Sequence, residues 1–136
     1  MKNKILLIGG AGYIGTVVAR HFIKKNFEVT CLDNLIYDNL DSVKELKKNI
    51  KFNLVVGDLR NEKLIEELLS NCDIAIILAG LVGDPITKKY PDIAEKINNE
   101  GIQRVIKNCV SKKIEKVIFV STCSNYGLSE TNTLLN

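Results

Sequence analysis

The sequence predicts an α/β fold: a doubly wound parallel sheet of about five strands between two layers of helices, in a three-layer αβα arrangement. Two observations predict it. Continuous apolar runs of strand length recur along the chain, and segments with helical spacing lie between them. Because the runs lack polar alternation, we expect the strands to be covered on both faces, as in parallel sheets. Parallel neighbours can be joined only by a crossover, so helices should lie on both faces of the sheet.

The predicted strands and helices alternate in chain order. Strands are expected at residues 5–8, 29–32, 52–56, 74–78 and 117–120. Helices are expected at residues 13–25, 42–48, 62–70 and 91–111, and the second of these has the poorest helical spacing. Asn61 precedes the third helix as a candidate N-cap, and Pro91 stands where a first-turn proline sacrifices no hydrogen bond.

Composition limits the chain to one globular domain. Of the 136 residues, 46% are hydrophobic and 26% are charged, which suits a single core. The longest apolar runs are far shorter than the roughly 18 residues that cross a membrane, so we expect no membrane span. The apolar stretch after Lys4 runs into a glycine cluster without a signal-peptide cleavage site, which favours a buried strand in a cytoplasmic protein.

Charge and cysteine usage exclude two further classes of function. The formal net charge is only +3, and the lysine pairs are dispersed without interleaved aromatic residues, so we expect no nucleic-acid partner. Cys31, Cys72, Cys109 and Cys123 have no Cys-x-x-Cys spacing, and His21 is the only histidine. The sequence therefore supports neither a metal site nor a disulfide framework.

A glycine-rich turn follows the first predicted strand. Gly9, Gly12 and Gly15 fall where the chain passes from strand into helix. In a dinucleotide site the first glycine permits the tight turn, the second lets the backbone approach a pyrophosphate, and the third allows close helix-to-strand packing. The helix N-terminus then offers free N–H groups to the phosphates. The turn thus predicts a Rossmann-type NAD(P)-binding domain over residues 1–136, with a ligand-free structural turn as the alternative.

An acidic residue closes the second predicted strand. Asp33 lies 18 positions after Gly15, where a carboxylate can accept hydrogen bonds from both hydroxyls of the adenosine ribose. The same carboxylate would repel the 2′-phosphate of NADP, and no arginine directly follows it, so NAD is favoured. The alternative is that Asp33 is only a turn residue in the Asp33-Asn34 pair.

Several segments together resemble one protein family. The glycine-x-x-glycine-x-x-glycine spacing resembles the extended short-chain dehydrogenase/reductase family, and Asp33-Asn34-Leu35 resembles the ribose-binding turn of its UDP-glucose 4-epimerases. Further matches, in order, are Gly57-Asp58-Leu59-Arg60, Leu78-Ala79-Gly80-Leu81, Asn98 with Gly101, and Ser121-Thr122-Cys123-Ser124-Asn125-Tyr126-Gly127. The matches run from residue 4 to residue 127, nearly the whole chain.

The resemblance implies NAD as cofactor, a nucleotide sugar as substrate, and transient oxidation at the sugar C4. The cofactor-binding residues it implies are Gly9, Gly12, Tyr13, Ile14, Gly15, Asp33, Asn34, Leu35, Asp58, Leu59, Leu78, Ala79, Gly80, Leu81, Asn98 and Ser121, with Asp58 and Leu59 at the adenine ring. Thr122 is the candidate catalytic residue, because the family's Ser or Thr at this place hydrogen-bonds the sugar hydroxyl being oxidised. Cys123 and Ser124 replace the Asp-Glu of 4,6-dehydratases, which disfavours dehydration and favours a 4-epimerase or a related reductase. The resemblance also implies a possible homodimer through the helix at residues 91–111.

The family's tyrosine-x-x-x-lysine pair, which performs proton transfer, should lie on the helix after the fifth strand. Tyr13, Tyr37, Tyr90 and Tyr126 all lack a lysine four positions later. We therefore expect the chain to be a domain truncated before that helix and before the substrate domain. We also expect this chain alone to bind NAD without turnover. Whether the chain alone is an enzyme stays open, and the alternative is a non-catalytic dinucleotide-binding or redox-sensing module of the same fold.

Overall fold

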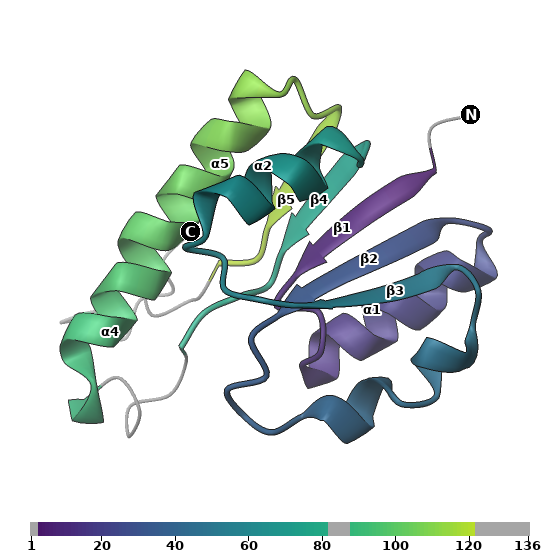
Figure 1. The fold of residues 1–136 in the computed structure, drawn as a ribbon, viewed down its shortest axis with the longest axis horizontal. Helices are drawn as coiled ribbons and strands as arrows, with labels where there is room; N and C mark the ends of the chain where they lie inside the picture. The colour runs from purple at the N-terminus through teal and green to yellow at the C-terminus, as the bar shows by residue number, and fades with distance from the viewer. Residues whose placement is uncertain (1–2, 82–87, 122–136) are drawn as a thin grey trace, which may run out of the picture.

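The computed structural model describes residues 3–81 and 88–121, and it contains a five-stranded parallel sheet (Figure 1). The strands are β1 (Lys4–Ile8), β2 (Glu28–Asp33), β3 (Phe52–Val56), β4 (Ile74–Ile77) and β5 (Lys116–Phe119). Their order in the sheet is β3-β2-β1-β4-β5, and every neighbouring pair is parallel. The predicted fold class is confirmed.

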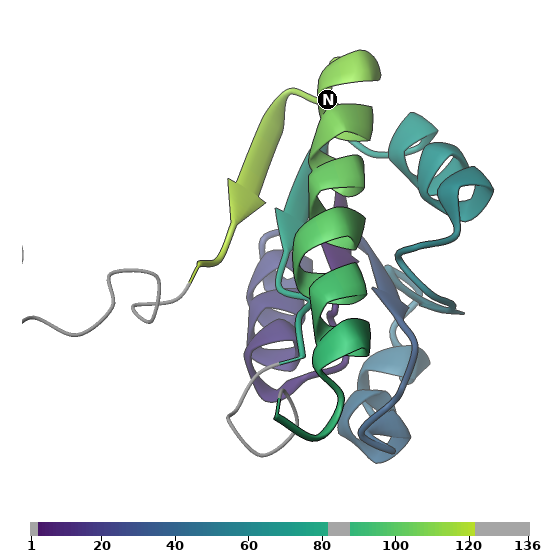
Figure 2. The same ribbon diagram turned by 90° about the vertical axis from the view of Figure 1, so that its left-hand side faces the viewer.

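Helices cover both faces of this sheet. Helix α1 (Tyr13–Lys24) lies on one face, and α2 (Glu62–Ser70) lies on the other, as Figure 2 shows. Helix α5 (Ile102–Ser111) packs beside α2, and the short α4 (Pro91–Glu95) precedes it. Because the chain crosses one face on leaving β1 and the opposite face on the way to β4, the sheet is doubly wound.

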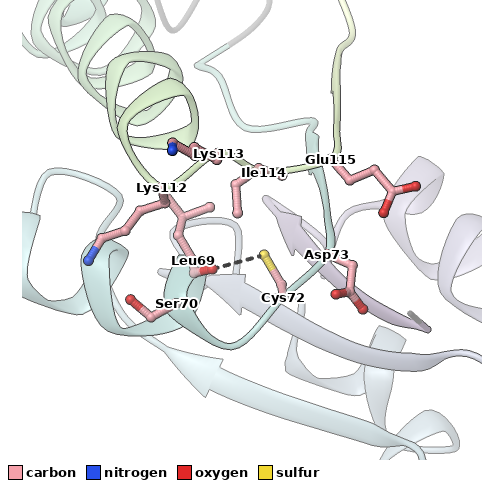
Figure 3. Close-up of a pocket in the computed structure, with 8 residues that line it drawn as sticks. All are labelled: Leu69, Ser70, Cys72, Asp73, Lys112, Lys113, Ile114 and Glu115. Atoms are coloured by element: carbon pink, nitrogen blue, oxygen red, sulfur yellow. Dashed lines mark hydrogen bonds between the residues drawn. The ribbon is translucent and has the colours of Figure 1, made fainter. Parts of the chain in front are cut away.

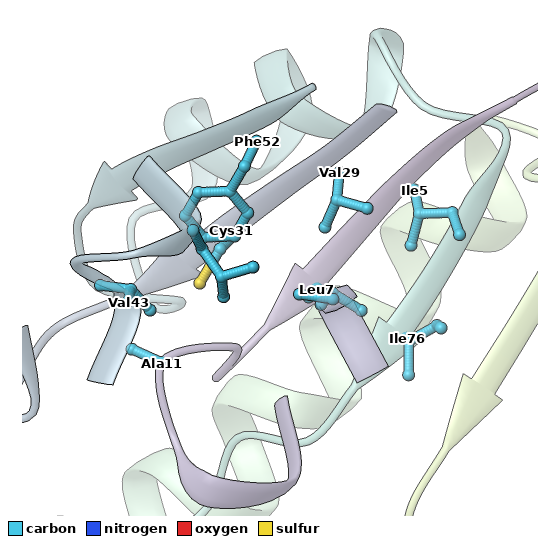
Figure 4. Packing of buried hydrophobic residues seen from close by; sticks show 10 residues of the cluster. Ile5, Leu7, Ala11, Val29, Cys31, Val43, Phe52 and Ile76 are labelled. Carbon is cyan, nitrogen blue, oxygen red and sulfur yellow. The ribbon is translucent and has the colours of Figure 1, made fainter. Parts of the chain in front are cut away.

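Alternate residues of β1 enter two separate cores. Ile5 and Leu7 point to the α1 side, where they pack with Ala19 of the helix. The other residues of this first core include Ala11, Val29, Cys31, Val43, Phe52 and Ile76 (Figure 4). Leu6 and Ile8 point to the opposite side and form a second core with Ile65, Leu69, Ala75, Ile77, Val105 and Cys109. A strand buried on both faces needs apolar residues without alternation, which explains the continuous apolar run.

The helix predicted at residues 42–48 is wrong. The chain instead forms two 3₁₀ turns, η1 (Leu40–Val43) and η2 (Leu46–Lys48). Val43 and Leu46 are the buried residues of the two turns, three positions apart. That spacing suits the tighter 3₁₀ geometry, and it leaves no apolar stripe long enough to hold a full α-helix.

The helix predicted at residues 91–111 is interrupted. Between α4 and α5 lies a π-helical stretch, η3 (Lys96–Gly101). Two capping predictions are confirmed: Pro91 begins α4, and the Asn61 side chain accepts a hydrogen bond from the Leu64 N–H of α2 at 3.2 Å. A π-helical turn within an α-helix often accompanies a functional site, so the residues of η3 are candidates for a functional site.

Strand β5 does not fit the prediction that every strand is covered on both faces. Val117 remains 39% exposed and Phe119 45% exposed. The reason is that β5 stands at the edge of the sheet with β4 as its neighbour, and no helix among the described residues covers its outer side. In the described part of the chain, none of the helices has the length and apolar character needed to cross a membrane.

Candidate functional site

A cleft of about 800 Å³ opens at the carboxyl ends of β1, β2 and β4. This is the point where the chain leaves β1 toward one face and β4 toward the other, which is where open α/β sheets bind ligands. The cleft has a volume typical of small-molecule sites. The predicted residues on its wall are Gly9, Gly12, Tyr13, Ile14, Gly15, Asp33, Asn34, Leu59, Leu78, Ala79, Gly80, Leu81, Asn98 and Ser121.

Two glycines of the turn are required by the protein itself. Gly9 has a φ of +80°, and a Cβ there would lie 2.6 Å from the Ala79 Cα. A Cβ on Gly15 would lie 2.4 Å from the Gly10 carbonyl oxygen. Both positions therefore exclude any larger side chain whether or not a ligand binds.

Gly12 is different, because nothing in the protein requires a glycine there. Its φ of −69° and ψ of 172° are open to any residue. A Cβ at this position would have the Gly9 carbonyl oxygen, 3.8 Å away, as its nearest neighbour. Gly12 nevertheless lies on the wall of the cleft. The absence of a side chain leaves space for a group that approaches the backbone from the cleft.

The N-terminus of α1 presents unpaired backbone donors at this wall. Gly12 is its N-cap, no side chain caps it, and its first turn holds no acidic residue. By contrast, Asn61 caps α2. A twelve-residue helix with an uncapped N-terminus places free N–H groups and a partial positive charge at the cleft, an arrangement that suits an anionic group.

Asp33 ends β2 beside the glycine turn. One carboxylate oxygen accepts a hydrogen bond from the Ala11 N–H, and the other accepts one from the Leu35 N–H, both at 2.9 Å. The turn role considered as an alternative is thus present, but the carboxylate also lies on the cleft wall. Each oxygen has a further lone pair, so both can still accept a hydrogen bond from a ligand hydroxyl.

The cleft carries almost no charge. Asp33 is its one charged side chain among the described residues, which contribute no lysine or arginine to the wall. An anionic ligand group would therefore be held by backbone N–H groups, and a hydroxyl-bearing group by the carboxylate. The described residues also contain no cluster of three or more His, Cys, Asp or Glu that could hold a metal ion.

A family model described as "NAD dependent epimerase/dehydratase family" matches residues 5–134. The chain belongs to this family. Among curated relatives, the bifunctional UDP-glucose 4-epimerase and UDP-xylose 4-epimerase 3 of Arabidopsis thaliana is 33% identical, over 96% of this chain and 39% of its own length. The UDP-N-acetyl-alpha-D-glucosaminuronate decarboxylase of Bacillus cytotoxicus is 29% identical, over 93% of this chain and 39% of its own length.

Solved structures agree with this membership. The UDP-Glc/GlcNAc 4-epimerase of Campylobacter jejuni superposes with a TM-score of 0.87 at 28% identity, over 97% of this chain and 41% of that one. The UDP-glucose 4-epimerase of Bifidobacterium longum, solved with NAD+ and UDP, gives a TM-score of 0.80 at 25% identity, over 96% and 40%. The chain thus spans about two fifths of the length of these epimerase/dehydratase relatives.

The long broken helix of this epimerase/dehydratase member contributes Asn98. Its side-chain oxygen accepts a hydrogen bond from the Leu81 N–H at 2.7 Å, and its amide nitrogen donates to the Leu81 carbonyl at 2.8 Å. Asn98 lies in the π-helical η3. The structure therefore gives Asn98 a part in holding the segment after β4 at the cleft wall, besides its own place on that wall.

Two predicted residues that the structure describes, Leu35 and Asp58, are not on the wall. Leu35 packs against the first core with a φ of 55°. Asp58 forms a double hydrogen bond with Arg60 at 2.6 and 2.9 Å, and these bonds hold the pKa of the Asp58 carboxyl below its ordinary value. Its neighbour Leu59 does reach the cleft. Thr122 lies outside the described residues.

Other wall residues carry no motif that could have predicted them. They include Ile36, Tyr37 and Asn39, from the connection that follows Asp33. The Asn39 side-chain oxygen is buried and has no hydrogen-bond partner within the described ranges. Only their position after a strand that ends at the cleft connects them with the site.

A second, smaller pocket lies at the opposite edge of the sheet, where β4 and β5 begin (Figure 3). Cys72 and the pair Lys112 and Lys113 line it. Burial, with smaller contributions from Cys109 and Asp73, raises the pKa of the Cys72 thiol to about 12. A thiol that stays protonated is a poor nucleophile, so Cys72 is not a candidate nucleophile.

Proposed function

We propose that this chain is the NAD-binding part of a nucleotide-sugar 4-epimerase, and that the cleft holds the dinucleotide with its diphosphate at Gly12. The observation that carries the proposal is the open space at Gly12, which neither backbone conformation nor packing explains. A diphosphate placed there would meet the uncapped N-terminus of α1. The cleft residues therefore fit NAD.

Asp33 supports NAD over NADP. A ribose with two free hydroxyls offers two donors to a carboxylate that accepts hydrogen bonds. A 2′-phosphate would bring negative charge to the one charged group on the wall, with no cation among the described wall residues to compensate. Leu59, which lies on the cleft wall, would cover one face of the adenine. Asp58 lies off the wall and bonds Arg60, so this arrangement gives it no contact with the adenine.

The chemistry supplied by NAD, when bound, is removal and return of hydride at the sugar C4. In the proposed enzyme, Ser121 would stand at the nicotinamide end of the wall and Thr122 would hydrogen-bond the sugar hydroxyl. The residues of the described chain bind and orient the cofactor, so this chain alone is expected to bind NAD without turnover. A 4-epimerase is favoured over a dehydratase because Cys123 and Ser124 follow Thr122.

We also propose that the intact enzyme forms a homodimer through the segment from α4 to α5. Ile93 and Val110 stand exposed on it, Val110 at 73%. Burying such residues against a second copy would remove apolar surface from water. Analytical ultracentrifugation of Val110→Glu is expected to show monomers where the unaltered protein dimerises, and an unchanged dimer would contradict the assignment of the interface.

The test of the binding proposal is isothermal titration calorimetry with NAD and NADP. We expect NAD to bind more tightly than NADP. Asp33→Asn is expected to lower NAD affinity about tenfold or more, since it weakens a charge-assisted hydrogen bond, and to narrow the preference over NADP. Glu66→Gln is the matched control, because Glu66 is an exposed acid on α2 away from the cleft. An unaltered chain that binds neither dinucleotide would refute the proposal.

A further inference from the structure

The connection between β2 and β3 contacts the glycine turn through one side chain. The Ser42 hydroxyl oxygen lies 2.6 Å from the Ala11 carbonyl oxygen, although the two residues are 31 positions apart. Ser42 belongs to η1, which is anchored by the fully buried Val43 in the same core as Ala11. The hydroxyl is therefore held in place against the turn.

The Ser42 hydroxyl has a second possible acceptor, the Asn39 carbonyl, also at 2.6 Å. A hydroxyl carries one proton, so it donates to one of the two at a time. The Ser42 N–H already bonds the Asn39 carbonyl at 3.1 Å and closes the 3₁₀ turn. The hydroxyl is thus not needed to close η1. The Ala11 carbonyl, by contrast, accepts no backbone hydrogen bond from the described part of the chain.

The Ala11 carbonyl belongs to the same peptide unit as the Gly12 N–H. A trans peptide is planar, with its carbonyl and its N–H pointing in opposite directions. A bond from Ser42 to the carbonyl therefore fixes the direction of the Gly12 N–H, which donates to no group within the described chain. A hydrogen bond at the carbonyl also polarises the peptide and strengthens its N–H as a donor.

On the other side of Ala11, the Asp33 carboxylate accepts from the Ala11 N–H. Both backbone hydrogen-bonding groups of Ala11 are thus held by side chains, one from the end of β2 and one from η1. Ala11 itself is fully buried. The residue that precedes Gly12 is fixed from two directions while Gly12 itself stays free.

We infer that Ser42 is a positioning residue, which acts through the Ala11 carbonyl to aim the Gly12 N–H at the diphosphate of the bound dinucleotide. This inference rests on the proposed function, because it presumes that the diphosphate lies at Gly12. Ser42 touches no ligand group in this role. The diphosphate should depend on Ser42, whereas the adenosine, held by Asp33 and Leu59, should not.

The test compares Ser42→Ala with the unaltered chain, using NAD and adenosine as separate probes in calorimetric or competition titrations. We expect Ser42→Ala to weaken NAD binding roughly three- to tenfold, the effect of one lost hydrogen bond, and to change adenosine binding less than twofold. Ser42→Thr keeps the hydroxyl and should restore NAD affinity. Ser70→Ala is the matched control, because the Ser70 hydroxyl also donates to a carbonyl, that of Glu66, at the distant end of α2.

The outcomes separate the two hypotheses. If the unaltered chain binds no NAD, the proposed function fails and this inference fails with it. If it binds NAD and Ser42→Ala binds equally well, or loses adenosine and NAD affinity to the same extent, the positioning role is refuted and the proposed function stands. A second readout uses amide NMR spectra: ADP should shift the Gly12 resonance more than adenosine does in the unaltered chain, and this difference should shrink in Ser42→Ala. Equal shifts in the unaltered chain would refute the placement of the diphosphate at Gly12, and a difference that Ser42→Ala leaves unchanged would refute the positioning role alone.

Discussion

Replacing Gly12 with alanine separates the demands of the fold from the demands of the ligand. The added methyl would stand 3.8 Å from its nearest protein neighbour, an ordinary contact distance. The backbone angles at Gly12 suit alanine. A Gly→Ala change at a compatible site stabilises by about 0.4–1 kcal/mol, and alanine is a poorer N-cap than glycine, which offsets part of this. We therefore expect the free energy of unfolding to change by less than about 1 kcal/mol.

The same methyl would occupy the surface that the diphosphate approaches. It would push the phosphate away from the N–H groups of α1, and each charge-assisted hydrogen bond contributes about 1.5–3 kcal/mol. We expect NAD affinity to fall at least tenfold, measured by titration calorimetry, with the melting temperature within a few degrees of the unaltered chain.

Gly15→Ala is the matched comparison for this experiment. Its methyl would lie 2.4 Å from the Gly10 carbonyl oxygen, so helix and turn must move apart. Overpacking of this kind costs about 1–3 kcal/mol, which should lower the melting temperature visibly by circular dichroism. If Gly12→Ala binds NAD like the unaltered chain, or if it unfolds as early as Gly15→Ala, the division of roles among the glycines is wrong.

Three further outcomes follow from other parts of the structure. Leu69→Ala, in the second core, should lower the free energy of unfolding by about 2–5 kcal/mol in urea titrations, and a loss below 1 kcal/mol would contradict its burial. Burial, reinforced by Asp33, raises the pKa of Cys31 to about 12, so the folded state keeps a proton that the unfolded state loses near pH 9. Stability should therefore fall as pH rises from about 9 toward 12, and Cys31→Ala should make this fall less steep, with Cys72 and Cys109 accounting for part of what remains. Asn98→Ala should weaken NAD binding by displacing the segment after β4, whereas Asn71→Ala, whose side chain bonds the Glu67 carbonyl at the end of α2 away from the cleft, should not.

Local sequence patterns were sufficient to predict most of the strands and helices. The apolar runs predicted the strands because a strand buried on both faces needs apolar residues at every position. The apolar runs wrongly predicted that β5 is covered on both faces, because an apolar run does not reveal whether a helix packs against that strand. They failed at residues 42–48, because two buried residues three apart suit a 3₁₀ turn as well as a helix.

The sequence by itself determined the fold class, the glycine turn and the acidic end of β2, since each depends on residues adjacent in the chain. Only the tertiary structure decided what the polar side chains bond. Ser42 meets Ala11 across 31 residues, and Asn98 meets Leu81 across 17. Such pairs arise from the way β1 lies between β2 and β4, so hydrogen-bond partners follow from the order of strands in the sheet. The same packing shows that a side chain at Gly9 or Gly15 would clash with the protein backbone, whereas a side chain at Gly12 would project into open space at the cleft.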